Sequence, residues 1–195
     1  MDMTATNDIE KKRMHPHKFV LWVAMGSIVM MFAGLTSAYI VKRNDGNWLE
    51  FPMPSVFWYS TVTIMISSVT IFLAQKSFKA REMARYRTLI NITALLGVLF
   101  AVLQVIGFIQ LGHQNIKLFG TGSNPSASFL GIITGLHVLH VLGGVIALIV
   151  LFFRAHRKRV KSYNSVPIEI VGTYWHFVDI LWIYLFVFFN MVGGG

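Results

Sequence analysis

Residues 128–153 read SFLGIITGLHVLHVLGGVIALIVLFF and contain no Asp, Glu, Lys or Arg. A helix needs about 20 apolar residues to cross the hydrocarbon core of a bilayer, so this stretch is long enough to span a membrane. A helix on the surface of a soluble protein would carry charged residues along one side. The segment is therefore predicted to be a membrane-spanning helix.

Four further stretches have the same character. They cover residues 19–41, 53–75, 88–112 and 170–192, and Asp179 is the single Asp, Glu, Lys or Arg in all five. Within hydrocarbon the backbone must pair its own polar groups, which leaves helices and closed barrels. The sequence lacks the alternating stretches of about 10 residues that mark barrel strands. We therefore predict an all-α integral membrane protein with a bundle of five transmembrane helices.

The composition agrees with a membrane protein that forms one domain. Charged residues make up 13% of the 195 residues, against about 25% in soluble domains. The absence of cysteine excludes disulfides and thiolate metal sites. We expect a polar arm over residues 1–18 and a transmembrane domain over residues 19–195. The first span has 23 uncharged residues, more than the roughly 7–15 of a cleavable signal peptide, so it is interpreted as an uncleaved anchor.

The lysines and arginines are divided unequally between the two ends of the predicted helices. One side has fourteen: Lys11, Lys12, Arg13, Lys18, Lys76, Lys79, Arg81, Arg85, Arg87, Arg154, Arg157, Lys158, Arg159 and Lys161. The other side has three: Lys42, Arg43 and Lys117. The positive-inside rule then predicts a cytoplasmic N-terminus and a C-terminus outside. Since this basic rim accounts for the net charge of +9, no nucleic-acid partner is expected.

Polar side chains gather on one side of the last predicted helix. At 3.6 residues per turn, the set Glu169, Thr173, His176, Asp179 and Asn190 falls on a single stripe. Such a stripe can be interhelical hydrogen-bond glue or part of a proton relay, and the spacing favours the structural interpretation. His176 and Asp179 are three residues apart, so they are neighbours on the helix surface and are able to pair with each other.

The helix over residues 128–153 carries two histidines and several glycines. His137 and His140 share a face with Gly144, while Gly131 and Gly135 form a pair of small residues on roughly the opposite face. Small residues let helix backbones approach closely, so this helix is expected inside the bundle, packed on both sides. We expect the polar network of the last helix to be supported by these two histidines.

The histidines within the predicted spans are candidate metal ligands. His137, His140 and His176 could supply part of a ligand set, which leaves a small membrane cytochrome or redox enzyme as the alternative function. No metalloprotease, P-loop or dinucleotide motif occurs, and no nucleophile with a base is evident. A transporter is disfavoured because broken helices and inverted repeats are not visible.

The last two predicted helices resemble subunit III of haem–copper terminal oxidases. The stretch Tyr174–Trp182, YWHFVDILW, resembles the family's last-helix signature, in which Trp175 also lies, and Glu169 stands at the family's spacing before it. The stretch Thr134–Val141, TGLHVLHV, followed by Gly144, resembles the preceding helix. Weaker likenesses are Phe32–Gly34 with Tyr39, Ser60-Thr61, and Ser67–Thr70. The order of the helices matches the five-helix bacterial form of cytochrome c and quinol oxidases.

The resemblance implies an accessory subunit in a multi-pass bacterial inner (plasma) membrane complex that reduces oxygen and pumps protons. It implies no catalytic site, cofactor or metal in this chain, with the haems and copper held by partner subunits. The expected partners are catalytic subunit I, other oxidase subunits and bound phospholipid. The implied role is assembly, lipid binding and sustained proton uptake. The electron donor and membership of a respiratory supercomplex stay open.

Two positions depart from the family pattern. Ile28 stands where members often carry a buried Glu in the first of these helices, and Gly107 stands at another acidic position after Gln104. A role for those carboxylates in lipid or proton handling is therefore not transferred to this chain.

Overall fold

The computed structural model describes residues 16–43, 54–113, 125–156 and 165–193, and these residues form five helices and no strand. The helices are α2 (Pro16–Arg43), α3 (Val56–Lys79), α4 (Met83–His113), α5 (Pro125–His156) and α6 (Val166–Gly193). All five are long and apolar enough to cross a membrane. The prediction of an all-α protein with five membrane-spanning helices is confirmed.

Prolines and one left-handed residue mark the ends of the helices. Every proline in the described residues lies at or before the first turn of a helix, where its missing N–H is not needed. Helix α3 begins at Val56, three residues after the expected start of the span, and the Pro54 carbonyl accepts the Phe57 N–H in the preceding turn, at 3.1 Å. Arg81 adopts a φ of 61° where the chain turns from α3 into α4.

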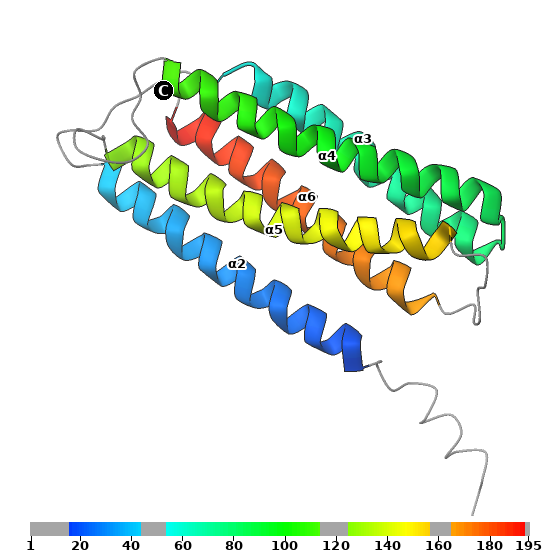
Figure 1. The fold of residues 1–195 in the computed structure, drawn as a ribbon. Coiled ribbons are helices and arrows are strands. Elements are labelled where there is room, and N and C mark those ends of the chain that lie inside the picture. Colours follow the sequence, from blue (N-terminus) through cyan, green and yellow to red (C-terminus); the bar gives the residue numbers. More distant parts are fainter. Residues whose placement is uncertain (1–15, 44–53, 114–124, 157–164, 194–195) are drawn as a thin grey trace, which may run out of the picture.

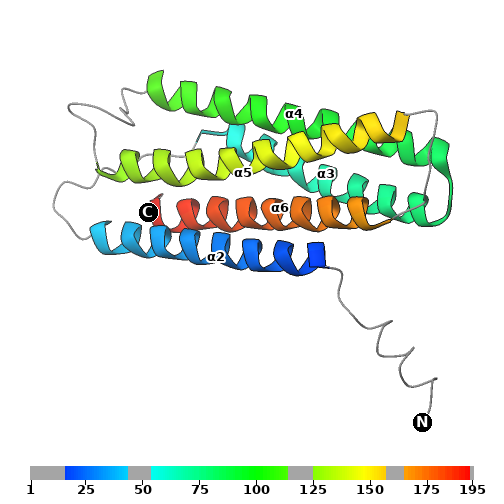
Figure 2. The ribbon, with the colours of Figure 1, turned by 60° about the horizontal axis from the view of Figure 1, so that its bottom comes forward.

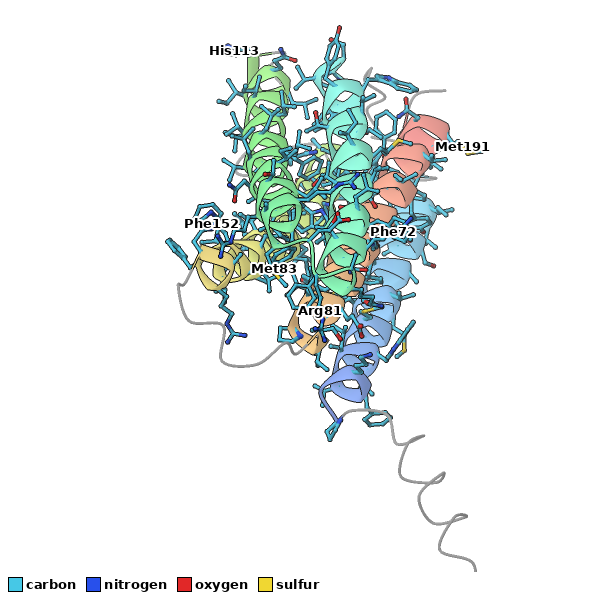
Figure 3. The ribbon with its side chains drawn as sticks, turned by 90° about the vertical axis from the view of Figure 1, so that its right-hand side faces the viewer. Phe72, Arg81, Met83, His113, Phe152 and Met191 are labelled. Carbon is cyan, nitrogen blue, oxygen red and sulfur yellow. The ribbon has the colours of Figure 1, made fainter. Side chains whose placement is uncertain are left out.

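Four helices form a closed set, and the fifth lies outside it. Helix α3 packs against α4 and α6, and α5 packs against the same two helices. Helix α2 packs on the outside, against α5 and α6, as Figures 1 and 2 show. Arg81 and Met83 lie at one end of the bundle and His113 at the other (Figure 3). The sequence colours in Figures 1 and 2 show that consecutive helices run in opposite directions.

The indole of Trp175, from α6, occupies the centre of the four-helix set and is 0% exposed. A Cβ atom added at Gly97 of α4 would lie 2.9 Å from this ring, and one added at Gly144 of α5 would also lie 2.9 Å from it. The indole N–H donates to Oγ of Ser67 on α3, at 3.1 Å. One side chain thus contacts three other helices, and two of them accommodate it only because they have glycine there.

The outer surface of the bundle is apolar. Leu95, Met30 and Met191 are 68%, 72% and 75% exposed, and Met191 projects outward near the end of α6 (Figure 3). Soluble monomers rarely expose apolar surface on this scale. Together with five helices of spanning length, this surface identifies the chain as a multi-pass membrane protein.

Candidate functional site

Hydroxyl groups of α3 hydrogen bond to the aromatic residues of α6. Besides the bond from Trp175 to Ser67, the Trp182 indole N–H donates to Oγ1 of Thr61 at 3.0 Å. Next to the first of these bonds, Nδ1 of His176 lies 2.6 Å from Oγ of Ser68. These bonds tie the signature segment of α6 to α3 over about two turns. The partners on α3 belong to the Ser/Thr pairs that gave only a weak family likeness in the sequence.

Asp179 is buried without a partner. The residue is 2% exposed, and within the described residues neither carboxyl oxygen has a hydrogen-bond partner. The pair between His176 and Asp179 that the spacing allows is therefore not formed, because His176 bonds to Ser68 instead. Ser68 also faces Asp179 from α3. Ser68 is therefore close to both side chains but hydrogen bonds to His176.

Glu169 joins three helices at the N-terminal end of α6. Its carboxylate lies 2.7 Å from Nζ of Lys18 on α2 and 3.2 Å from Nζ of Lys79 on α3. The side chains are partly exposed, so each ion pair is worth at most about 1 kcal/mol. Thr173, one turn further along α6, donates its hydroxyl to the Glu169 backbone carbonyl at 2.8 Å.

A cavity of about 320 Å³ lies beside this ion cluster, between α2, α3 and α6. We call it the polar pocket; its lining includes Lys18, Trp22, Gln75, Lys79, Glu169 and Thr173. The amide of Gln75 also donates to the backbone carbonyl of Ile168, at 3.3 Å. The pocket therefore brings two cations and several hydrogen-bonding groups to one end of the bundle.

An apolar groove of about 400 Å³ lies further along α2 and α6, two of the three helices that line the polar pocket. Its lining includes Val29, Phe32, Phe177, Ile180, Leu181 and Tyr184. The hydroxyl of Tyr184 lies 2.9 Å from Oγ1 of Thr36 on α2. This contact helps to hold α2 against α6 at the far end of the groove.

His137 and His140 face different surroundings. His137 is 0% exposed, and within the described residues neither ring nitrogen has a hydrogen-bond partner. Its ring stacks on Trp182, with centroids 5.3 Å apart, and the edges of Phe32 and Phe100 also approach it. Nδ1 of His140 lies 2.7 Å from the Leu136 carbonyl of its own helix. Its backbone carbonyl accepts the Tyr174 hydroxyl at 3.0 Å.

The candidate residues therefore do not form one connected network in the described part of the chain. Glu169 belongs to the ion cluster, His176 to the contact with α3, and His137 to an aromatic core. Asn190 donates only to the Phe186 carbonyl of its own helix, at 2.9 Å. Among the residues that the structure describes, no three His, Asp or Glu side chains lie close enough to hold a metal ion.

The glycines of α5 also differ from one another. Gly144 receives the Trp175 ring and Gly131 is buried, but a Cβ atom at Gly135 would meet nothing within 4 Å. Within this chain, then, the Gly135 side of α5 is open. Two glycines of α4 that the sequence did not single out for packing also lie against large rings. Gly97 receives Trp175, and a Cβ atom added at Gly107 would lie 2.8 Å from the ring of Phe57.

Other contacts were not foreseen from the sequence. The buried amide of Gln104 on α4 donates to Oγ of Ser60 at 3.2 Å, and Thr93 lies 2.8 Å from Thr70. The sequence showed these residues as polar side chains within otherwise apolar spans. Each such side chain needs a partner in hydrocarbon. Lys18 was assigned to the polar arm, although the structure places it within α2.

Comparison with known proteins identifies the family. The family model for cytochrome c oxidase subunit III matches residues 48–194. A cytochrome c oxidase subunit 3 from Bacillus sp. (strain PS3) is 30% identical over 91% of this chain and 86% of its own length. A probable cytochrome c oxidase subunit 3 from Nocardia farcinica is 32% identical, over 86% and 82% of the two chains. One from Rickettsia bellii is 28% identical, over 98% and 76%. The chain therefore belongs to the cytochrome c oxidase subunit III family.

Proposed function

We propose that this chain is an accessory subunit III of a proton-pumping haem–copper oxidase of the aerobic respiratory chain. It binds no redox centre and supports the catalytic subunit while that subunit reduces oxygen to water. The match of the family model to residues 48–194 carries this proposal. The names of the relatives favour cytochrome c over a quinol as the electron donor of the complex. Its partners are catalytic subunit I and the other oxidase subunits.

The surroundings of the three membrane histidines support the assignment of haem and copper to partner subunits. An axial haem ligand needs one ring nitrogen directed at the iron beside a space for the porphyrin. His137 is 0% exposed and is enclosed by the rings of Trp182, Phe32 and Phe100, which leave no such space beside it. The alternative of a small cytochrome would therefore have to rely on His140 and His176 alone.

The contacts of α6 support a structural role for its polar residues. Glu169 draws Lys18 of α2 and Lys79 of α3 to the same carboxylate, and His176 bonds α6 to α3. Polar contacts of this kind between membrane helices contribute about 0.6–2 kcal/mol each. We propose that these interhelical contacts fix the bundle that the catalytic subunit binds, while the side chains of Thr173 and His140 bond within their own helices.

The polar pocket and the apolar groove, which both lie beside α2 and α6, support the proposal of phospholipid binding. The polar pocket offers two lysines for a phosphate group, and the apolar groove follows it along the same helices. A bound lipid would sit with its head group at the basic end of the bundle. We propose that lipid held there helps the subunit to remain associated during turnover and to sustain proton uptake.

We expect purification through a tag on this chain to recover the haem-containing oxidase. Once separated from its partners, the chain should show no Soret band and no stoichiometric iron or copper. Visible spectroscopy and metal analysis of both fractions check this result. One haem per isolated chain, or recovery of the chain with no oxidase subunit, would overturn the proposal.

We also propose that the protein lies in a bacterial plasma membrane with its N-terminus in the cytoplasm. Basic residues of α2 and α3 meet at one end of the bundle, where Lys18 and Lys79 both pair with Glu169 of α6. Arg87 joins α4 to α5 at that end too, where its side chain donates to the Ala155 carbonyl at 2.8 Å. The positive-inside rule places this end in the cytoplasm.

Cysteine labelling tests the orientation, since the chain has no native cysteine. Ala80→Cys lies in the turn between α3 and α4, and His113→Cys lies at the opposite end of α4; both positions are exposed. An impermeant thiol reagent added to intact cells should label His113→Cys and leave Ala80→Cys unlabelled. Both should react after the cells are opened. The reverse pattern in intact cells would contradict the orientation.

A further inference from the structure

Helix α2 is attached to the bundle unevenly along its length. In its C-terminal half the side chains of Phe32, Thr36 and Tyr39 are all buried. The Tyr39 ring lies 5.4 Å from the ring of Phe188 on α6, measured between centroids, and the Thr36 hydroxyl lies 2.9 Å from that of Tyr184. This half of α2 is therefore packed firmly against the neighbouring helices.

The first turns of α2 are held much less tightly. We call residues 16–25 the strap. Among the side chains that the structure describes in the strap, only Met25, at its last position, is buried, while Phe19 and Val20 are 58% and 65% exposed. In the described part of the chain, one ion pair joins a strap side chain to another helix. It links Lys18 to Glu169 of α6, at 2.7 Å.

A glycine and a serine, Gly26 and Ser27, separate the strap from the packed half. Sharp bends in helices occur at pairs of this kind. The Ser27 hydroxyl donates to the Val23 carbonyl of its own helix at 3.1 Å, a bond that often bends helices. A Cβ atom added at Gly26 would meet nothing within 4 Å, so close packing does not explain the glycine. The pair therefore has the position and the chemistry of a hinge.

The strap forms one wall of the polar pocket. The residues of α2 that line this pocket are Lys18, Leu21 and Trp22, which all belong to the strap. The residues of α2 that line the apolar groove begin at Val29, beyond the hinge. A movement of the strap would therefore open the polar pocket and leave the wall of the apolar groove in place.

We propose that the strap is a movable wall of the polar pocket, hinged at Gly26 and Ser27 and latched by the ion pair between Lys18 and Glu169. When Lys18 withdraws, Glu169 keeps Lys79 of α3 as a partner, at 3.2 Å, so opening leaves no unpaired carboxylate. The latch is weak. A partly exposed ion pair changes an equilibrium by at most about fivefold, which corresponds to about 1 kcal/mol.

Opening exposes the deeper lining of the pocket, including Gln75 and Thr173, to molecules at the basic end of the bundle. Closing returns Lys18 to Glu169. The strap is thus a device for controlling access to the pocket. It goes beyond the proposed function of the subunit and does not depend on which molecule enters.

Thiol labelling of the purified complex tests the latch. The chain has no native cysteine, so the mass of this chain reports the modification of Thr173→Cys by an uncharged thiol reagent. In this background Lys18→Gln should raise the labelling rate up to about fivefold, because the rate follows the fraction of molecules with an open strap. If Thr173→Cys lowers assembly, Ile170→Cys, which also lines the pocket from α6, takes its place.

Lys79→Gln is the matched control for the latch. It removes the same charge from the same carboxylate, but Lys79 belongs to α3 and does not hold the strap. The labelling rate should therefore stay at the level of Thr173→Cys alone. Equal rates in Lys18→Gln and Lys79→Gln would overturn the latch.

A second pair of variants tests the hinge. Gly26→Ala favours a straight helix at the hinge, since alanine is a far better helix former than glycine. Added to Lys18→Gln, it should return the labelling rate toward that of Thr173→Cys alone. Gly34→Ala is the control, because its added Cβ atom also meets nothing within 4 Å but lies in the packed half of α2. It should leave the faster rate unchanged. Equal rates with the two alanines would refute the hinge.

Discussion

Gly144→Leu is expected to remove most of this subunit from the purified oxidase. An added Cβ atom would lie 2.9 Å from the Trp175 ring, closer than real side chains approach. The ring is closely packed on another side too, where a Cβ atom added at Gly97 of α4 would also lie 2.9 Å from it. Overpacking of a core costs about 1–3 kcal/mol, and we expect about 3 kcal/mol here because a leucine adds further atoms to the contact.

The adjacent Gly143 provides a matched control. It is exposed, and an added Cβ atom there would meet only the Tyr174 hydroxyl, at an ordinary 3.7 Å. Gly143→Leu should therefore be retained much better than Gly144→Leu, although both replace glycine by leucine in α5. Immunoblots of membranes and of the purified complex give the two amounts. Equal retention would show that the Trp175 contact does not determine assembly.

Trp182→Ala should have an effect of similar size. Trp182 is 1% exposed, stacks on His137 and packs against Phe100 with ring centroids 5.5 Å apart. Loss of a buried Trp or Phe side chain typically costs about 3–5 kcal/mol. The unfolded helix also lies in hydrocarbon, so the transfer part of this cost is reduced, and we expect about 3 kcal/mol. The subunit should dissociate from the complex at a clearly lower temperature.

Trp182→Phe separates the packing of Trp182 from its hydrogen bond. Phenylalanine retains most of the ring contacts but loses the donation to Thr61, which is worth about 1 kcal/mol. The dissociation temperature should therefore fall between that of the unaltered subunit and that of Trp182→Ala. A Trp182→Ala subunit as heat-resistant as the unaltered one would contradict this account of the core.

The polar stripe of α6 illustrates what periodicity can and cannot predict. The periodicity placed Glu169, His176 and Asp179 on one side of a helix, but it could not identify the residues of other helices that contact them. Glu169 meets Lys18, which lies 151 residues away in the sequence, and His176 meets Ser68 at a separation of 108 residues. Spacing along one helix suggested a pair between His176 and Asp179 because residues three or four positions apart are the neighbours that a single helix brings together.

Gly107 also shows that contacts between helices cannot be predicted from the sequence, here at a position that was compared with the family pattern. In the sequence it stood out only as a missing carboxylate. In the structure it is the site where the Phe57 ring of α3 reaches α4. A glycine has no side chain whose chemistry could indicate this role, and the ring that it accommodates comes from another helix.

The sequence by itself determined the fold class and the number of spans in this protein. A bilayer leaves the backbone no partner outside its own segment, so an uncharged stretch of about 20 residues is a helix whatever surrounds it. Only the tertiary structure decided which helices meet, which glycines accept Trp175 and why the carboxyl oxygens of Asp179 lack a hydrogen-bond partner among the described residues. Each of these depends on how side chains from separate helices fit together, and lipid-facing and protein-facing apolar residues look alike in a sequence.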